Sequence, residues 1–328
     1  MYLTIFISLA VIMLIFIVNV AIDVIFSIKR KEAYKKSELV LAYVLLLPAV
    51  ILAFFFVLMP IIMSLGYSFT DANVLQIESA QFDNFANFKR FFEDLVDTQS
   101  SLHISIKNTA LFVVLVVPLQ IGLALALALF CNNKKKGTAI FKICFFTPVA
   151  VSLSVTCFLW KEILSPSETG FMNSILGLFG IAPQDFLNSE KTTIPWMVVM
   201  SAWQGCGYQM LIFLSALGNI RKDLYEAASI DGASKFRQFF NITLPGLKPT
   251  LLYILITVFI GACRVMIQPM ILTKNYDGGL TLSLYMYNQG FLTSGPGFGF
   301  SCAIALILSI IIGTITLLQR KLLGEKKK

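Results

Sequence analysis

Residues 108–129 read NTALFVVLVVPLQIGLALALAL, which is long and apolar enough to cross a bilayer as one helix. The composition agrees, because 57% of the residues are hydrophobic and only 13% are charged, about half the charged share of soluble domains. The sequence therefore predicts an all-α polytopic transmembrane bundle with about seven spans. These lie at about residues 2–28, 39–64, 106–131, 143–164, 193–218, 249–273 and 298–319.

Basic residues predict the orientation of this bundle. Most of the 26 Lys and Arg residues lie within four segments, 29–36, 134–142, 221–248 and 320–328, which share one side of the membrane if seven spans alternate. The positive-inside rule then places the N-terminus outside and the C-terminus in the cytoplasm. The net charge of +8 is explained in the same way, so we expect a lipid bilayer and no nucleic acid as a partner.

The sequence offers no pattern for catalysis or for a metal. His103 is the single histidine, and none of the six cysteines forms a CxxC pair, so no metal site is expected. A nucleotide-binding G-x-x-x-x-G-K-[ST] run is not found, and the glycine-rich 295–299 lacks the lysine. We therefore expect a chain that is not an enzyme and binds no cofactor itself.

The loop 219–248, NIRKDLYEAASIDGASKFRQFFNITLPGLK, has its own pattern. Asp223 followed by Glu226 predicts an N-cap and capping box, and Gly232 predicts a break between two short helices. Phe236, Phe239 and Phe240 give the second helix an apolar stripe at i, i+3, i+4 spacing. Such a surface suits a groove in a partner protein, although packing on the chain's own bundle explains it equally well.

Glu226-Ala227-Ala228, Gly232 and Ile242-x-Leu244-Pro245 together resemble the EAA loop of ABC importer permeases. The carbohydrate (maltose-type) branch of this binding-protein-dependent family also has stretches similar to YSFTD (67–71), FFTPVAVS (145–152) and TLSLYMYNQGF (281–291). The resemblance spans about residues 40–320. It implies an extra transmembrane helix and basic linker at 1–38, a permease domain at 39–320 and a basic tail at 321–328. The chain departs from the family pattern at 274–279, where the family often has Gly-Gly-Pro.

The resemblance implies a coupling mechanism. Glu226 would anchor the loop in a cytoplasmic ATPase dimer, Ala227 and Ala228 would permit close approach, and Gly232 would shape the turn. ATP and Mg²⁺ would be held by the ATPase. Further partners would be a second homologous permease subunit and an extracytoplasmic solute-binding protein, in a bacterial plasma membrane.

Polar residues within the spans are candidates for a substrate path, because polar groups are costly at membrane depth. The fifth span contains Gly207 and Gln209 besides the candidates, and in related permeases the fifth and sixth spans line the sugar cavity. Hydrogen bonding between helices is the alternative explanation. The candidate residues are Ser201, Trp203, Gln204, Gly205, Tyr208, Arg264 and Gln268.

The expected function is ATP-driven import of a sugar or oligosaccharide, with a sugar phosphate or glycerol phosphate as further candidate substrates. A secondary transporter or a seven-helix receptor would share the membrane topology. A receptor does not explain the pattern at 226–245, and transport without ATP would favour a secondary transporter.

Overall fold

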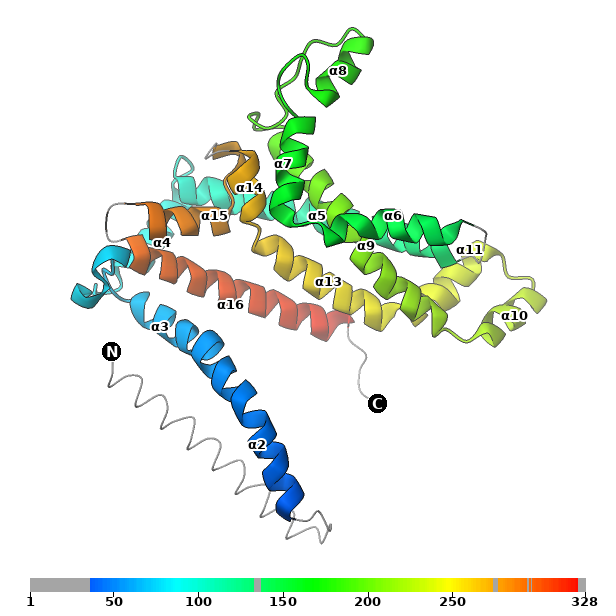
Figure 1. Ribbon diagram of the computed structural model, residues 1–328, viewed down its shortest axis with the longest axis horizontal. Helices are drawn as coiled ribbons and strands as arrows, with labels where there is room; N and C mark the ends of the chain where they lie inside the picture. The colour runs from blue at the N-terminus through cyan, green and yellow to red at the C-terminus, as the bar shows by residue number, and fades with distance from the viewer. Residues whose placement is uncertain (1–35, 133–136, 274–276, 294, 296, 324–328) are drawn as a thin grey trace.

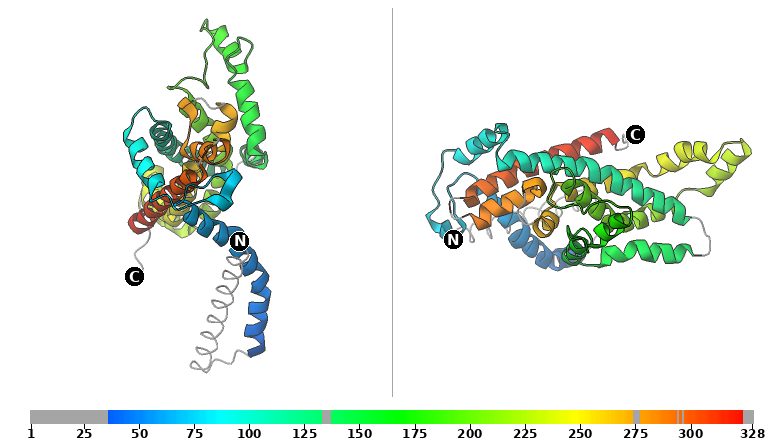
Figure 2. Two further views of the ribbon diagram at one scale, coloured as in Figure 1. Left: turned by 90° about the vertical axis from the view of Figure 1, so that its left-hand side faces the viewer. Right: turned by 90° about the horizontal axis from the view of Figure 1, so that it is seen from above.

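The computed structural model describes residues 36–132, 137–273, 277–293, 295 and 297–323. The predicted first span at about 2–28 lies outside the described residues, as does the end of the predicted tail from 324 onward. The described part is an α-helical bundle. Its centre is formed by four helices that pack side by side, α5 (Ser101–Asn132), α9 (Thr193–Gly218), α13 (Lys248–Cys263) and α16 (Gly297–Leu323) (Figures 1 and 2).

Shorter elements gather at the two ends of this bundle (Figure 1). The α15 end contains α4 (Ala86–Val96), α14 (Ile267–Leu272), η4 (Asp277–Gly279), α15 (Leu282–Tyr287) and η5 (Asn288–Leu292). The α10 end contains α10 (Lys222–Ile230), α11 (Lys235–Gln238), η3 (Phe239–Thr243) and α12 (Leu244–Gly246). Outside these groups, and apart from the first helices described below, the elements are η2 (Val74–Ser79), α6 (Thr138–Ala150), α7 (Leu153–Ile163) and α8 (Phe171–Leu178).

Four described helices are long and apolar enough to cross a membrane, and two bent helix pairs raise the number to six if each pair is one span. These six overlap the second to seventh predicted spans, and the pair that overlaps the sixth joins Lys235–Gly246 to Lys248–Cys263 at a 67° bend. The all-helical membrane fold is thus confirmed. Two predicted spans are not continuous helices, however. The run at 143–164 is divided between α6 and α7, and the run at 249–273 is divided between α13 and α14.

The break between α6 and α7 bends the chain by 102°. Pro148 lies in the last turn of α6 and has no N–H to continue the helical ladder. Val151 and Ser152 then adopt extended backbone angles before α7 begins. Hydropathy predicted one span here because both halves are apolar, and hydropathy carries no information about a bend.

The break after α13 is stabilised by hydroxyl groups from a distant segment. Pro269 cannot donate an N–H to the carbonyl of Val265, and that carbonyl accepts a 2.7 Å hydrogen bond from Thr281 Oγ1 instead. The Cys263 carbonyl lies 3.4 Å from Ser283 Oγ, which donates to it. These side chains satisfy backbone groups that a continuous helix would have paired internally.

The first described helices form an arm that leaves the bundle. α2 (Lys36–Ala53), the π-helical turn η1 (Phe54–Leu58) and α3 (Met59–Tyr67) follow one another, and only α3 packs against α16 (Figures 1 and 2). Between Leu45 and Tyr67, only 6% of the residues in the most apolar 18-residue window are buried within the described structure. The arm therefore presents apolar side chains outward, as expected of a helix surrounded by lipid or by another chain.

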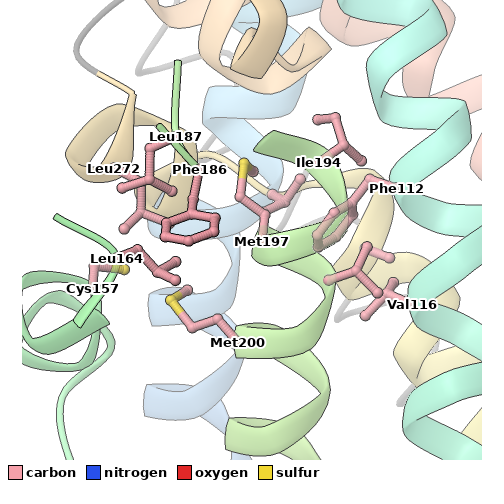
Figure 3. Close-up of a cluster of buried hydrophobic side chains, with 13 residues drawn as sticks. Phe112, Val116, Cys157, Leu164, Phe186, Leu187, Ile194, Met197, Met200 and Leu272 are labelled. Atoms are coloured by element: carbon pink, nitrogen blue, oxygen red, sulfur yellow. The ribbon is translucent and has the colours of Figure 1, made fainter. Parts of the chain in front are cut away.

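Large apolar side chains fill the space between α5, α7 and α9 (Figure 3). Phe112 and Val116 from α5 meet Met197 and Met200 from α9, and Cys157 from α7 packs in the same cluster. All five are at most 2% exposed. The cluster holds α7 against the bundle despite the bend that precedes it.

Small residues set the distance between α6 and α9. A Cβ atom on Gly207 would lie 2.0 Å from the carbonyl oxygen of Phe145, and backbone atoms cannot move aside as a flexible side chain would. We expect Gly207→Ala to cost about 1–3 kcal/mol through overpacking and to lower the melting temperature of the purified protein.

Gly218→Ala is the matched control for this variant. It lies in the same helix, and its new Cβ would meet nothing within 4 Å. The control should melt at the parent temperature or slightly above it, because alanine favours helix. Equal melting of Gly207→Ala and Gly218→Ala would contradict the close approach of α6 and α9.

Candidate functional site

The loop 219–248 forms two short helices with a glycine between them, as predicted. α10 ends at Ile230 and α11 begins at Lys235, and Gly232 between them has a φ of +72°. This left-handed backbone is open to glycine at little steric cost. The loop protrudes from the α10 end of the bundle (Figure 1).

Side-chain hydrogen bonds hold the two halves of this loop together. The hydroxyl of Tyr225 on α10 lies 2.9 Å from Thr243 Oγ1 in η3. The amide of Gln238 donates to Ser229 Oγ at 3.0 Å and to the carbonyl of Ala233 at 3.2 Å. Tyr225 precedes Glu226, and Thr243 lies between Ile242 and Leu244. The structure thus brings both ends of the predicted motif together.

The loop 219–248 is thus a helical hairpin, and the predicted coupling residues lie at its surface. Glu226, Ala227 and Gly232 are exposed, and Ala228 is half-buried. Ile242 and Leu244 are half-buried, and Pro245 is exposed. Apolar neighbours are exposed as well, since Ile230 is 87% and Phe236 is 75% accessible.

One sequence expectation about this loop is wrong. Arg221 is the N-cap residue of α10, and no side chain caps the helix there. Asp223 lies in the first turn and pairs with Arg221, with its Oδ1 3.1 Å from Arg221 Nε. The hydrogen bond from the Arg221 guanidinium lowers the pKa of the Asp223 carboxyl, and the hydrogen bond to the Asp223 carboxylate raises the pKa of Arg221. The Asp223 carboxylate therefore pairs with a cation, and the residue at the N-cap position is Arg221.

A cavity of about 410 Å³ lies at the centre of the bundle. Its largest wall is one face of α9, because Ser201, Gln204, Gly205, Tyr208 and Gln209 recur at three- and four-residue spacing. α5 and α13 form two more walls, and the α6–α7 bend and α14 complete it. The two breaks in the predicted spans therefore both border this cavity.

Most of the predicted substrate-path residues meet here. Ser201 Oγ lies 2.9 Å from Oε1 of Gln268 on α14 and 2.7 Å from the carbonyl of Met197. Gln204 donates a 3.4 Å hydrogen bond from Nε2 to Thr156 Oγ1. Tyr208 is half exposed, so its ring is accessible at the cavity wall. Ser201, Gln204, Gly205, Tyr208 and Gln268 thus form one group.

Two predicted path residues lie elsewhere. Arg264 lines a second cavity, of about 630 Å³, together with residues of α15 and α16. Trp203 packs edge-on against Trp160 with 5.9 Å between ring centroids and is not among the residues that line the first cavity. The helical face explains both placements, because residue 203 and residue 264 point away from the faces of α9 and α13 that border the cavity.

Two glutamines complete the group and were not among the predicted path residues. Gln120 on α5 is 8% exposed, and its amide lies over Gly205, where a Cβ would approach Gln120 Nε2 to 2.2 Å. Gln209 is 9% exposed, and its Oε1 has no hydrogen-bond partner among the described residues. The sequence signal for Gln120 was its position as a polar residue within the apolar run 108–129.

Apolar helices of membrane-crossing length, a polar central cavity and an exposed helical hairpin define a polytopic membrane protein built around a polar path. The family model described as "binding-protein-dependent transport system inner membrane component" matches residues 107–324. The chain belongs to this family, and it is a multi-pass inner-membrane transport protein of the ABC importer class. The predicted family and membrane location are confirmed, and the receptor and secondary-transporter alternatives are not favoured.

Relatives along most of the chain are also permeases. The arabinooligosaccharides transport system permease protein AraP of Bacillus subtilis (strain 168) is 39% identical over 211 residues, which cover 63% of this chain and 67% of AraP. The probable ABC transporter permease protein YesP of the same organism is 32% identical and covers 90% of this chain and 94% of its own length. The lactose transport system permease protein LacF of Rhizobium radiobacter is 30% identical, with 90% and 98% coverage.

A solved structure has the same fold. A bacterial ABC transporter involved in the import of the acidic polysaccharide alginate aligns with a TM-score of 0.74 over 88% of this chain and 96% of its own. The aligned sequences are 23% identical, so this similarity concerns the fold alone.

The contact between Tyr225 and Thr243 gives a prediction about loop rigidity. Tyr225→Phe removes a hydroxyl that joins α10 to η3, and one hydrogen bond contributes about 1 kcal/mol. We expect severalfold faster amide hydrogen exchange across 222–230, measured by mass spectrometry on the purified protein. Tyr253→Phe on α13, which has no hydrogen bond from its hydroxyl among the described residues, should leave this exchange unchanged. Unchanged exchange in Tyr225→Phe would contradict a stabilising hydrogen bond between Tyr225 and Thr243.

Proposed function

We propose that this chain is the permease subunit that carries a carbohydrate through an ATP-driven importer, and that the loop 219–248 couples it to a separate ATPase. The observation that carries the proposal is the exposed hairpin, in which Glu226 and Ala227 lie beside accessible apolar side chains such as Ile230. Apolar surface of this kind is stabilised by a groove in a partner protein.

The hairpin is suited to transmit force. Gln238 and Tyr225 join its two helices by side-chain hydrogen bonds, so a displacement of α10 moves η3 as well. Glu226 would accept hydrogen bonds from the ATPase or pair with a cation there, and Ala227 and Ala228 would allow close backbone approach. ATP and Mg²⁺ would be bound by the ATPase dimer, whose closure biases the permease between two conformations.

The central cavity is the proposed substrate site. Ser201, Gln204, Tyr208 and Gln268 would supply hydrogen bonds to sugar hydroxyls, and Gly205 leaves room for the amide of Gln120. Support comes from relatives named for arabinooligosaccharides and lactose. Arg264 and Trp203 would act outside this cavity, with Arg264 available to an anionic group or to a second subunit.

The remaining partners follow from the family. We propose a second, homologous permease beside this one and an external solute-binding protein that delivers the sugar. A solved relative in fold is an alginate transporter in complex with a periplasmic protein that holds an alginate pentasaccharide, which is an instance of such delivery. The outward apolar side chains of the α2–α3 arm are available to the second permease or to lipid.

The test is an uptake assay in proteoliposomes that contain this chain together with the proposed second permease and the ATPase. The solute-binding protein is supplied from outside. Labelled neutral oligosaccharide should accumulate only when ATP is enclosed with the ATPase. Accumulation without ATP, or ATP hydrolysis that no oligosaccharide stimulates, would refute the proposal.

Gly232 provides a sharper test of coupling. Gly232→Val places a β-branched residue at φ +72° and should deform the turn, since such residues are outliers in left-handed backbone. We expect at least about tenfold lower uptake with the protein still inserted and basal ATP hydrolysis still present, because strain of about 1–3 kcal/mol displaces α10.

Gly232→Asn is the matched control, because asparagine tolerates this backbone region. It should retain most of the uptake. Equal uptake in the valine and asparagine variants would show that the turn geometry does not matter for coupling.

A further inference from the structure

The walls that the described residues form around the central cavity carry no formal charge. Among the described residues that line it, the polar side chains are carboxamides and hydroxyls, and no Asp, Glu, Lys or Arg is present. The carboxamides belong to Gln120, Gln204, Gln209 and Gln268. Four neutral amides around one cavity have both donors and acceptors to offer a ligand.

The cation closest in sequence to this site is turned elsewhere. Arg264 lies between two wall residues, Ala262 and Val265, yet it lines the second cavity with Ser283 and Met286 of α15. Arg264 follows Ile260 by four positions and lines the second cavity with it, on the face of the chain that does not border the central cavity. The guanidinium is therefore not available as a counter-ion within the central cavity.

An anion would be unstable in such a place. Transfer of a carboxylate or phosphate out of water is costly unless a cation and several hydrogen-bond donors replace its hydration. Sites for these groups usually contain Arg, Lys or clustered backbone N–H groups. A neutral sugar meets no such penalty, because its hydroxyls both donate to and accept from carboxamides.

One wall residue, Gln209, has an unpaired acceptor among the described residues. Gln209 Oε1 is a buried acceptor with no partner among the described residues, and buried acceptors are normally paired. A sugar hydroxyl is a donor of the right kind, whereas an ionised carboxylate has only acceptors and would face the amide oxygen with like polarity.

We infer that this site selects uncharged saccharides and excludes uronic acids and sugar phosphates, with Gln209 as a specificity-determining residue that accepts a hydrogen bond from a sugar hydroxyl. The inference rests on the proposed function, since it concerns the substrate class of the same cavity. The volume of about 410 Å³ lies near the lower end of small-molecule sites, so it admits a short saccharide or one end of a longer one.

The test measures binding to the complete permease–ATPase complex in nanodiscs, without the solute-binding protein, whose own specificity would obscure the result. Saturation-transfer NMR detects weak ligands. The neutral probes are arabinotriose, maltotriose and lactose, and the acidic probe is trigalacturonate. We expect signals from at least one neutral probe and at least about tenfold weaker signals from trigalacturonate.

Gln209→Met keeps the length of the side chain and removes the acceptor. It should weaken binding of the neutral probe up to about tenfold, the effect of one hydrogen bond. Gln319→Met is the matched control, since Gln319 Oε1 is also unpaired among the described residues but lies on α16 outside the cavity. Size-exclusion chromatography establishes that both variants assemble.

The outcomes separate the two claims. Trigalacturonate binding as strong as that of the neutral probes would overturn charge exclusion and leave a carbohydrate permease in place. Equal binding by Gln209→Met and Gln319→Met would overturn the role of Gln209. If none of the saccharides binds, the proposed function itself fails. The comparison of neutral and acidic probes uses the unaltered complex, so it holds even if a variant does not assemble.

Discussion

Every backbone N–H and carbonyl within an apolar environment needs a hydrogen-bond partner, and this requirement governs where the helices of this protein are interrupted. A helix satisfies its own backbone, so each interruption needs side-chain donors or acceptors from elsewhere. After α13 they come from Thr281 and Ser283, which bond the carbonyls of Val265 and Cys263. Asn108 on α5 donates in turn to the carbonyls of Asp277 and Leu280, which fixes the segment that carries Thr281.

The interruptions are where the central cavity lies. An unbroken sixth span would carry residues 264–272 onward along the α13 axis, whereas the break allows Gln268 on α14 to meet Ser201 on α9. On the other side of the cavity, the 102° bend between α6 and α7 leaves Val149 and Leu153 at the wall. The helices α5, α9 and α13 supply a rigid frame, and the broken segments supply the shape. Non-helical backbone at membrane depth is tolerated where it borders a polar cavity, and both breaks do so.

The sequence was sufficient to predict the helical membrane bundle, because apolar runs of bilayer length have few alternatives. It also predicted the hairpin around Gly232, since a glycine between two short amphipathic segments marks a helix end. The breaks were not predicted, because a hydropathy average does not register where Pro148 and Pro269 leave backbone carbonyls without a helical N–H donor. Arg264 was grouped with Gln268 for the same reason. A continuous span would place the two residues one helical turn apart on one face. In the structure Arg264 borders the second cavity together with Ile260 of α13, and Gln268 on α14 borders the central cavity. Gln120 was overlooked because it lies within a long apolar run.

The exposed hairpin and the cavity are connected directly through two helices. α9 carries Ser201 and Gln209 on the cavity wall and ends at Gly218, immediately before the loop 219–248. α13 begins at Lys248, the last residue of that loop, and carries Ala262 on another wall of the cavity. Because the interior of a helix is close-packed, a displacement of α10 would reach both walls through these two helices. A partner bound to α10, as proposed, would therefore act on the residues that line the cavity.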